Sequence, residues 1–238
     1  PGGTGKTTTL YTILHGLRSQ RKNIITLEDP VEYYIEGLRQ SQIRPEIGFD
    51  FIDGLKAILR QNPDVIMIGE IRDDKTAEAS IRASLMGSLF LSTMHTTNSV
   101  GTIVRLLEFN LPRSFIASSL SLIIAQRLVR IICPYCIEED KPSAKTFELS
   151  KASKNKKFFK GKGCTHCDGD GYFGRKGIFE FMFINKNIQQ LIINSAPFTE
   201  IEEAAKLNGM HTLREEAVRQ AEKGVTTLEE VIRVTPND

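Results

Sequence analysis

The chain has 238 residues, 40% of them hydrophobic and 25% charged, with a formal net charge of +2. This composition is ordinary for a globular protein. The small charge excess makes no basic field by itself, so it argues neither for nor against a nucleic-acid partner. No apolar run reaches the ~20 residues that a membrane helix needs.

Residues 1–130 alternate helical patterns with short apolar runs, as in a parallel α/β sheet. The patterns predict strands over residues 23–27, 64–70 and 88–95, and helices over residues 7–20, 54–61, 75–86, 100–109 and 114–131.

The remainder of the chain divides into two regions that differ in composition and in expected secondary structure. Residues 131–177 hold the cysteines, many glycines and a lysine-rich stretch, which favours a small metal-binding module. From residue 178 onward regular structure returns, with a predicted strand over 177–184 and helices over 199–209 and 212–224, both ending at glycines. We therefore expect domains at 1–130, 131–177 and 178–238.

The opening stretch "PGGTGKTTT" resembles the inside of a phosphate-binding loop. Glycines let backbone N–H groups turn toward phosphate oxygens, a lysine meets the β- and γ-phosphates, and the next hydroxyl holds Mg²⁺. The full pattern needs a glycine before Pro1, so we expect the sequence to begin within this loop. A flexible glycine-rich stretch is the alternative. The candidate nucleotide-binding residues are Gly2, Gly3, Thr4, Gly5, Lys6 (the cation), Thr7 (the Mg²⁺ ligand) and Thr8.

Polar residues follow each predicted strand. Glu28 and Asp29 come after the first strand, Glu70 ends the second, and His95 ends the third. Ligands of open parallel sheets bind beyond the carboxyl ends of the strands, so these groups should converge beside the phosphate loop. Glu70 is expected to orient the attacking water or to hold Mg²⁺ through water. For His95, a structural role and contact with the γ-phosphate both remain open.

The four cysteines form two C-x-x-C pairs, Cys133 with Cys136 and Cys164 with Cys167. Four thiolates satisfy tetrahedral Zn²⁺ and leave no open position, so we expect a structural site. His166 lies between two ligands and is expected to point elsewhere. Redox chemistry is the alternative for these pairs.

The stretch "SKASKNKKFFKGKG" at 150–163 has two interpretations. Lysines near an anionic leaflet can each contribute ~1 kcal/mol to membrane binding. A solvated, partly disordered insertion is the interpretation we prefer. The residues concerned are Lys151, Lys154, Lys156, Lys157, Phe158, Phe159, Lys160 and Lys162.

The segments "TLEDPVEY", "LRQNPDVIMIGEIRD", "STMHT" and "QRLVR" followed by "CPYC" occur in one order along the chain. They resemble the Asp box, Walker B, His box and metal motif of the type II secretion and type IV pilus-assembly ATPases. The resemblance covers essentially the whole chain. By resemblance, Glu28, Asp29 and Glu32 are the Asp-box acids, Glu70 is the catalytic glutamate, His95 is the His-box histidine, and Arg72 matches a family arginine of open role.

This resemblance implies a RecA-like P-loop core over 1–130 that lacks its first strand and an amino-terminal domain. It further implies ATP, Mg²⁺ and Zn²⁺ as cofactors, a homo-hexamer, and a cytoplasmic protein at the inner membrane that docks on a platform protein. The zinc module favours an extending or secreting motor over a retracting one. The carboxyl-terminal segment is expected to pack on the core or on a neighbouring subunit.

The sequence departs from the family in three places. Ser88 stands where a second histidine is common, and Asp53 and Lys56 replace arginines. Lysine lacks the planar fork of arginine, so contacts of these positions across a subunit interface are in doubt. Arg44 and Arg60 are candidate substitutes.

Two other functions remain open. A RecA-like nucleic-acid motor is disfavoured because no basic stripe interleaved with aromatics is found beyond the lysine stretch. A nucleotide-binding adaptor with weak hydrolysis would suit the altered helix residues.

Overall fold

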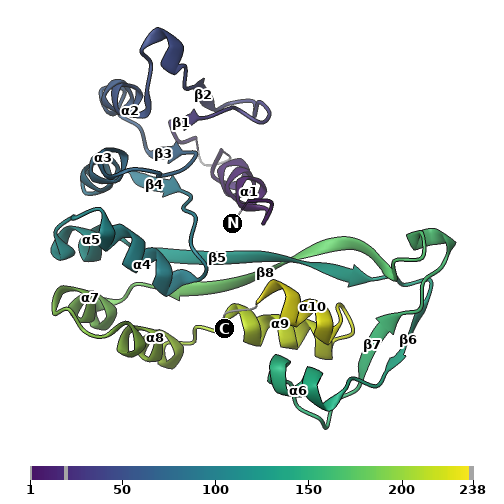
Figure 1. Ribbon diagram of the computed structural model, residues 1–238. Helices are drawn as coiled ribbons and strands as arrows, with labels where there is room; N and C mark the ends of the chain where they lie inside the picture. Colours follow the sequence, from purple (N-terminus) through teal and green to yellow (C-terminus); the bar gives the residue numbers. More distant parts are fainter. Residues whose placement is uncertain (1, 19–20, 236–238) are drawn as a thin grey trace. The chain divides into compact units, whose positions relative to one another are not determined.

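The computed structural model describes residues 2–18 and 21–235, which form two compact units (Figure 1). Of the described residues, those up to 123 and 184–204 form the sheet unit, and residues 124–183 and 205–235 form the cysteine unit.

The sheet unit is built on four parallel strands in the order β2-β1-β3-β4. Ile25 of β1 lies opposite Ile66 of β3, which in turn lies opposite Phe90 of β4. The bounds of its elements are α1 (Lys6–Arg18), β1 (Ile24–Glu28), β2 (Arg39–Gln42), η1 (Pro45–Ile47), α2 (Phe51–Leu59), β3 (Val65–Ile68), α3 (Asp74–Ser84), β4 (Leu89–Ser92), α4 (Ser99–Glu108), α5 (Arg113–Ser119), α7 (Lys186–Ile193) and α8 (Phe198–Leu207), the last of which runs into the other unit.

The two central strands are buried on both faces, which explains their uninterrupted apolar sequences. Successive side chains of a strand point to opposite faces. Accordingly, Ile24 and Met67 pack against α1, whereas Leu27 and Ile66 pack against α2. Gly54 of α2 permits this close approach, since a Cβ there would lie 2.8 Å from Leu27 Cδ2.

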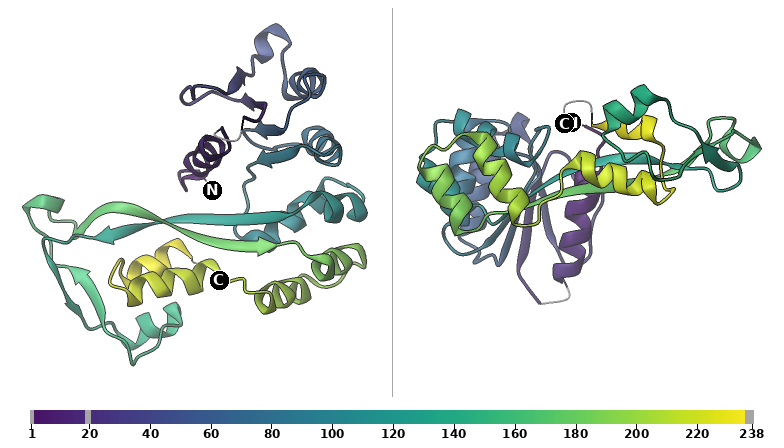
Figure 2. Two further views of the ribbon diagram at one scale, coloured as in Figure 1. Left: turned by 180° about the vertical axis from the view of Figure 1, so that it is seen from behind. Right: turned by 90° about the horizontal axis from the view of Figure 1, so that it is seen from below.

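The cysteine unit is organised around a ribbon of two paired strands, β5 (Leu122–Ile132) and β8 (Tyr172–Phe183). Helices α9 (Leu213–Glu222) and α10 (Leu228–Val234), drawn in yellow, lie along one side of this ribbon in the left view of Figure 2. Val129 and Ile178 of the ribbon are buried against Ala217 and Val231 of these helices. The remaining elements are β6 (Ile137–Asp140), α6 (Ala144–Ser150), β7 (Phe158–Gly161) and η2 (Thr165–Cys167).

The strands predicted over 23–27, 64–70, 88–95 and 177–184 are confirmed as β1, β3, β4 and the carboxyl-terminal part of β8. The helices predicted over 54–61, 75–86, 100–109, 199–209 and 212–224 are confirmed as α2, α3, α4, α8 and α9, with boundary shifts of a few residues. The helix predicted over 7–20 is confirmed as α1, although Ser19 and Gln20 lie outside the described residues.

The helix predicted over 114–131 is wrong beyond Ser119, because the chain turns into β5 at Leu122. A short apolar run suits a buried strand as well as a helix, and periodicity alone does not separate them. Pairing with β8 decides the outcome. The expectation that the lysine-rich stretch 150–163 is solvated and partly disordered is wrong for Phe158–Gly161, because β7 forms there and Phe158 is buried.

None of the helices within the described residues is both long enough and apolar enough to cross a membrane.

Candidate functional site

The carboxyl ends of β1, β3 and β4 meet at one edge of the sheet, because the three strands are parallel neighbours. The backbone beyond the strands stays tied across this edge. Gly69 N–H donates to Leu27 O at 2.8 Å, and Ile71 N–H donates to Thr93 O at 2.9 Å. The Thr93 hydroxyl adds a hydrogen bond to Gly69 O at 2.8 Å. The segments that carry Glu70 and His95 are therefore held at defined positions.

Glu70 is the centre of the polar group at this edge. One carboxylate oxygen lies 2.8 Å from His95 Nε2, and the other pairs with the guanidinium of Arg72. The Glu70 side chain is 17% exposed, whereas His95 and Arg72 are about half exposed. The structure thus brings together three of the residues predicted from the sequence.

Burial opposes ionisation of Glu70, but its partners reverse the effect. Burial alone raises the pKa of Glu70, whereas the hydrogen bonds and charges of Arg72 and His95 lower it by more, so the net shift is downward. Glu70 is therefore ionised at neutral pH and available to accept a hydrogen bond from a water molecule.

Arg72 connects two of the predicted acids. Arg72 Nη1 lies 3.6 Å from Asp29 Oδ2, while Arg72 Nη2 pairs with Glu70 Oε1. The hydrogen bond to Glu70 raises the pKa of Arg72, which stays charged. Arg72 thereby links the segment after β1 to the segment after β3.

Glu28 is placed differently from the other acids. Its side chain is buried, and it accepts hydrogen bonds from the Tyr11 hydroxyl, from Thr26 Oγ1 at 2.5 Å and from Gln40 Nε2 at 3.1 Å. Glu32 is exposed, and its backbone N–H donates to the Tyr11 hydroxyl at 3.2 Å.

Sequence reasoning missed Tyr11, Thr26 and Gln40. Tyr11 falls on the apolar face of α1, where a tyrosine is indistinguishable from an ordinary core residue.

The glycine-rich loop leads directly into α1, which begins at Lys6. Gly3 and Gly5 have φ values of 69° and 84°, a region that glycine enters without strain. The first helical turn carries no acidic residue, so nothing there opposes a bound anion. Thr7 is exposed and Thr4 is buried. The donor set of this loop fits phosphate groups, since helix N-termini present unpaired N–H groups.

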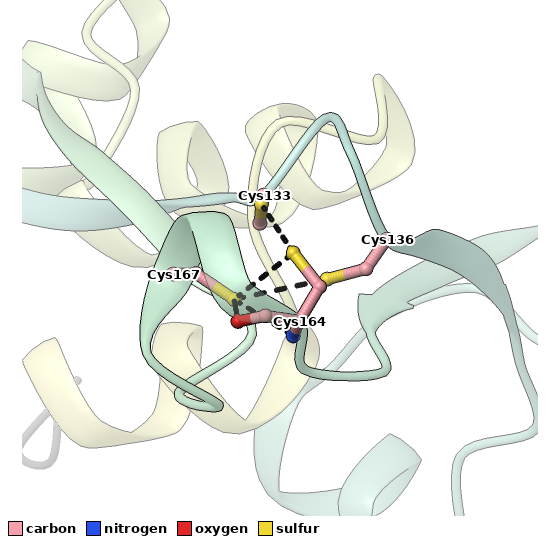
Figure 3. A group of neighbouring side chains, drawn as sticks. All are labelled: Cys133, Cys136, Cys164 and Cys167. Atoms are coloured by element: carbon pink, nitrogen blue, oxygen red, sulfur yellow. Dashed lines mark hydrogen bonds between the residues drawn. The ribbon is translucent and has the colours of Figure 1, made fainter.

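The four cysteines gather in the cysteine unit, two from the turn after β5 and two from the turn before β8 (Figure 3). Their sulfur atoms all lie within 4.8 Å of one another. The Sγ atoms of Cys133 and Cys164 are 3.9 Å apart, as are those of Cys136 and Cys167. Such a compact set of four sulfurs fits a tetrahedral Zn²⁺ ion.

Backbone N–H groups point at the sulfurs. Gly163 N–H donates to Cys136 Sγ, and Gly171 N–H donates to Cys167 Sγ, both at 3.3 Å. Burial raises the pKa of the Cys136 thiol to about 12. Burial also opposes ionisation of Cys167, but N–H donors from Cys164 and Gly171 lower its pKa to about 7. The environment therefore stabilises a thiolate at Cys167, as a metal ligand requires.

Glycines make the close packing of the two turns possible. A Cβ on Gly161 would lie 2.0 Å from Gly171 O, and one on Gly171 would lie 2.6 Å from Gly161 O. Gly171 also has a φ of 78°. His166 takes no part in the sulfur cluster, because its ring stacks on Tyr135 with centroids 4.1 Å apart. The expectation that His166 points elsewhere is confirmed.

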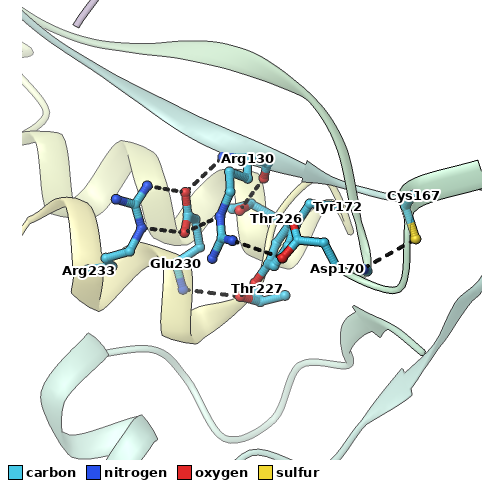
Figure 4. A network of polar contacts seen from close by, with 9 residues as sticks. Arg130, Cys167, Asp170, Tyr172, Thr226, Thr227, Glu230 and Arg233 are labelled. Carbon is cyan, nitrogen blue, oxygen red and sulfur yellow. Dashed lines mark hydrogen bonds and ion pairs between the residues drawn. The ribbon is translucent and has the colours of Figure 1, made fainter. Parts of the chain in front are cut away.

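A polar network ties the second cysteine turn to α10 (Figure 4). Glu230, fully buried, accepts hydrogen bonds from Arg130 and from Arg233. Arg130 also reaches Asp170 at 3.5 Å and lies over the ring of Tyr172, 3.8 Å from its centroid. Burial raises the pKa of Glu230, but the two guanidinium groups lower it by more, so the net shift is downward.

The positions that depart from the resemblance have local partners. Lys56 pairs with Asp53 at 3.1 Å along α2. The Ser88 hydroxyl donates to Pro63 O at 2.8 Å.

The chain matches the family model described as "Type II/IV secretion system protein" over residues 1–233. It is 42% identical over 238 residues to the type II secretion system protein E of Pseudomonas aeruginosa. The aligned region covers 99% of this chain and 47% of that protein. It is also 42% identical over 239 residues to the type IV pilus assembly ATPase PilB of Thermus thermophilus. Here the aligned region covers 99% of this chain and 27% of that protein.

A solved structure of the pilus retraction motor PilT with bound ADP matches with a TM-score of 0.72 and 26% identity, covering 100% of this chain and 60% of that one. The mixed α/β fold is therefore that of this pilus retraction motor. The chain spans about half or less of the length of these two curated relatives. Because the family model matches almost the whole length of this chain, the chain belongs to the type II/IV secretion system protein family.

Proposed function

We propose that this chain contains the RecA-like ATPase core of a motor that powers type IV pilus assembly or type II protein secretion. The observation that carries the proposal is the Glu70 carboxylate held between His95 and Arg72 at the carboxyl edge of a parallel sheet. Relatives named as secretion and pilus-assembly ATPases support the same function.

In this proposal, the N–H groups of Gly2, Gly3 and Gly5 and the Lys6 ammonium bind the phosphates of ATP. Thr7 and Thr8 supply hydroxyls, with Thr7 holding Mg²⁺, which would neutralise charge on the β- and γ-phosphates. Thr4, which is buried between Gly3 and Gly5, is part of the same nucleotide-binding loop.

Glu70 orients the attacking water because it is ionised and partly exposed. His95 steadies Glu70 and contacts the γ-phosphate. Asp29 and Arg72 keep the neighbouring segment aligned, and Glu32 faces solvent where a metal-bound water or a second subunit can meet it.

The proposed division is an ATPase core at 1–130, a zinc module at 131–177 and a carboxyl-terminal segment at 178–238. Zn²⁺ would be held by Cys133, Cys136, Cys164 and Cys167 and would be structural, since four sulfurs leave no position for substrate. The motor would act as a homo-hexamer that docks on an inner-membrane platform protein from the cytoplasmic side.

Two lysines of the lysine-rich stretch pair with carboxylates, which disfavours peripheral contact of this stretch with a membrane. Lys157 pairs with Glu139 at 3.5 Å, and Lys160 pairs with Asp140 at 3.2 Å. These carboxylates reduce the positive field that an anionic surface would meet. The nucleic-acid motor has no specific support in the described residues, and the weakly hydrolysing adaptor is tested by the same experiment as the motor.

The decisive experiment measures ATP turnover by the full-length protein that contains this chain. Glu70→Gln keeps the shape but removes the charge, so we expect turnover to fall at least 100-fold while nucleotide binding persists. Glu78→Gln, on the exposed face of α3, is the matched control and should turn over normally. Wild-type turnover that survives Glu70→Gln would overturn the assignment.

A further inference from the structure

Tyr11 connects the helix that follows the phosphate loop to the acidic segment, residues 28–32. It belongs to α1, four residues after Thr7, so the two side chains share one face of the helix. Its side chain is buried, and its hydroxyl reaches Glu28 at the end of β1. A single hydroxyl thus joins the helix that follows the loop to the strand that precedes the acids.

Glu28 is a buried carboxylate held by neutral donors. Tyr11 donates to one oxygen, and Thr26 and Gln40 donate to the other. A buried carboxylate depends strongly on each of the donors that satisfy it. Both of its oxygens are therefore committed to the protein itself.

The same hydroxyl also holds the segment after Glu28. The backbone N–H of Glu32 donates to Tyr11 Oη at 3.2 Å, and the ring of Tyr33 meets the Tyr11 ring edge-on with centroids 4.6 Å apart. Burial, followed by the contact with Glu28, raises the pKa of Tyr11, so the hydroxyl stays protonated and keeps donating. Segment 29–33 is thus anchored to α1 rather than to the sheet alone.

We propose that Tyr11 is a positioning residue that couples the first turns of α1 to segment 28–32, and that Glu28 acts through Tyr11 instead of contacting the nucleotide. The inference deepens the proposed ATPase function and rests on it. A shift of α1 that follows the γ-phosphate would then move Asp29 and Glu32, which follow Glu28 directly. The coupling is local, because it needs only one buried hydroxyl and two partners.

The first test is Tyr11→Phe in the full-length protein, which removes the hydroxyl and keeps the ring. We expect kcat for ATP to fall about 10-fold, with KM changed less than 2-fold, because the loop still binds phosphate while the acids lose their alignment. Tyr34→Phe, at an exposed tyrosine, is the matched control and should keep its kcat. An unchanged kcat in Tyr11→Phe would overturn the proposal.

Thr26→Val separates positioning from general stability. Thr26 donates to the same carboxylate, and this hydrogen bond does not reach segment 29–33. We expect Thr26→Val to lower the thermal unfolding midpoint as much as Tyr11→Phe does, with a kcat within about 3-fold of wild type. Equal losses of kcat in both variants would mean that the hydroxyl is merely structural.

A double-mutant cycle with Glu28→Gln tests whether Glu28 acts through Tyr11. Residues that act as one unit are strongly non-additive, so the double variant should be no slower than the slower single variant. Losses that multiply, or a loss in Glu28→Gln alone that matches Glu70→Gln, would show Glu28 acting on the nucleotide directly.

Amide hydrogen exchange without nucleotide keeps the two proposals distinguishable. Residues 29–36 should exchange faster in Tyr11→Phe than in wild type and Tyr34→Phe. Faster exchange in a protein that never turns over ATP would retain the anchoring and refute the ATPase function. Unchanged exchange in an active ATPase would refute the coupling alone.

Discussion

Glu70 and His95 meet at 2.8 Å although they follow different strands and lie 25 positions apart in the chain. The contact exists because β3 and β4 are parallel neighbours in register, with Ile68 opposite Ser92. His95 then limits the directions in which the Glu70 carboxylate can point. This geometry makes the histidine a partner of the acid before any nucleotide binds.

His95→Ala should lower ATP turnover by about 10- to 100-fold, because the Glu70 carboxylate loses one of its two supports. His95→Gln restores an N–H donor and should recover part of the loss. Steady-state kinetics of the full-length protein measures both variants. A His95→Gln variant as slow as His95→Ala would mean that the hydrogen bond to Glu70 does not account for the loss, and that the proposed contact with the γ-phosphate dominates.

Glu230→Gln should destabilise the cysteine unit by about 2 kcal/mol at pH 7. Breaking a buried ion pair costs ~3–5 kcal/mol, and the partial exposure of Arg130 and Arg233 reduces this cost. Urea unfolding provides the measurement, with the exposed Glu229→Gln as control.

The effect of Glu230 should depend on pH in one direction. Its pKa is lowered in the folded protein, so its stabilisation is fully present above its usual pKa of 4.5 and is lost as pH falls through the lower folded value. The difference between wild type and Glu230→Gln should therefore shrink below pH 4.5. A difference that grows in acid would contradict the assigned ion pairs.

Removal of one sulfur should release the metal of the cysteine cluster. We expect one zinc ion per chain by elemental analysis, and loss of that ion in Cys164→Ser, because three remaining thiolates bind Zn²⁺ more weakly. His166→Ala is the matched control and should keep its zinc, since His166 stacks on Tyr135 away from the sulfurs. A wild-type protein whose cysteines are found paired as disulfides would support the redox alternative.

Gly161→Ala should disturb the cysteine turns more than Gly169→Ala. The added methyl group at residue 161 would lie 2.0 Å from Gly171 O, a clash that needs backbone movement and should cost on the order of 3 kcal/mol. At Gly169 the space is open, so only its positive φ is penalised, by about 1 kcal/mol. Zinc retention during urea titration compares the two, and equal retention would contradict the tight approach.

Much of the sheet unit could be predicted from local sequence. Strands buried on both faces, such as β1 and β3, read as continuous apolar runs, and the parallel arrangement then brings their polar ends to one edge. The cysteine spacing likewise predicted a compact sulfur cluster, because two turns with two thiols each need a common centre.

Pairing partners outside the local pattern could not be predicted. Residues 122–132 have the apolar content of a buried helix, and only hydrogen bonding with residues 172–183 makes them a strand. The strand at 158–161 could not be predicted either. It lies among lysines, and Phe158 is its only buried residue, so no apolar pattern marks it as a strand.

The sequence by itself determined which chemical groups this protein has: a glycine-rich loop with Lys6, an acid after each of two strands, a histidine after a third, and four cysteines. The tertiary structure alone decided which acids face solvent. Glu28 ends one apolar strand and Glu70 follows another. Tyr11, Thr26 and Gln40 nevertheless enclose Glu28, while His95 and Arg72 leave Glu70 partly exposed. The reason is physical, because burial and hydrogen bonding depend on neighbours that are distant in the chain.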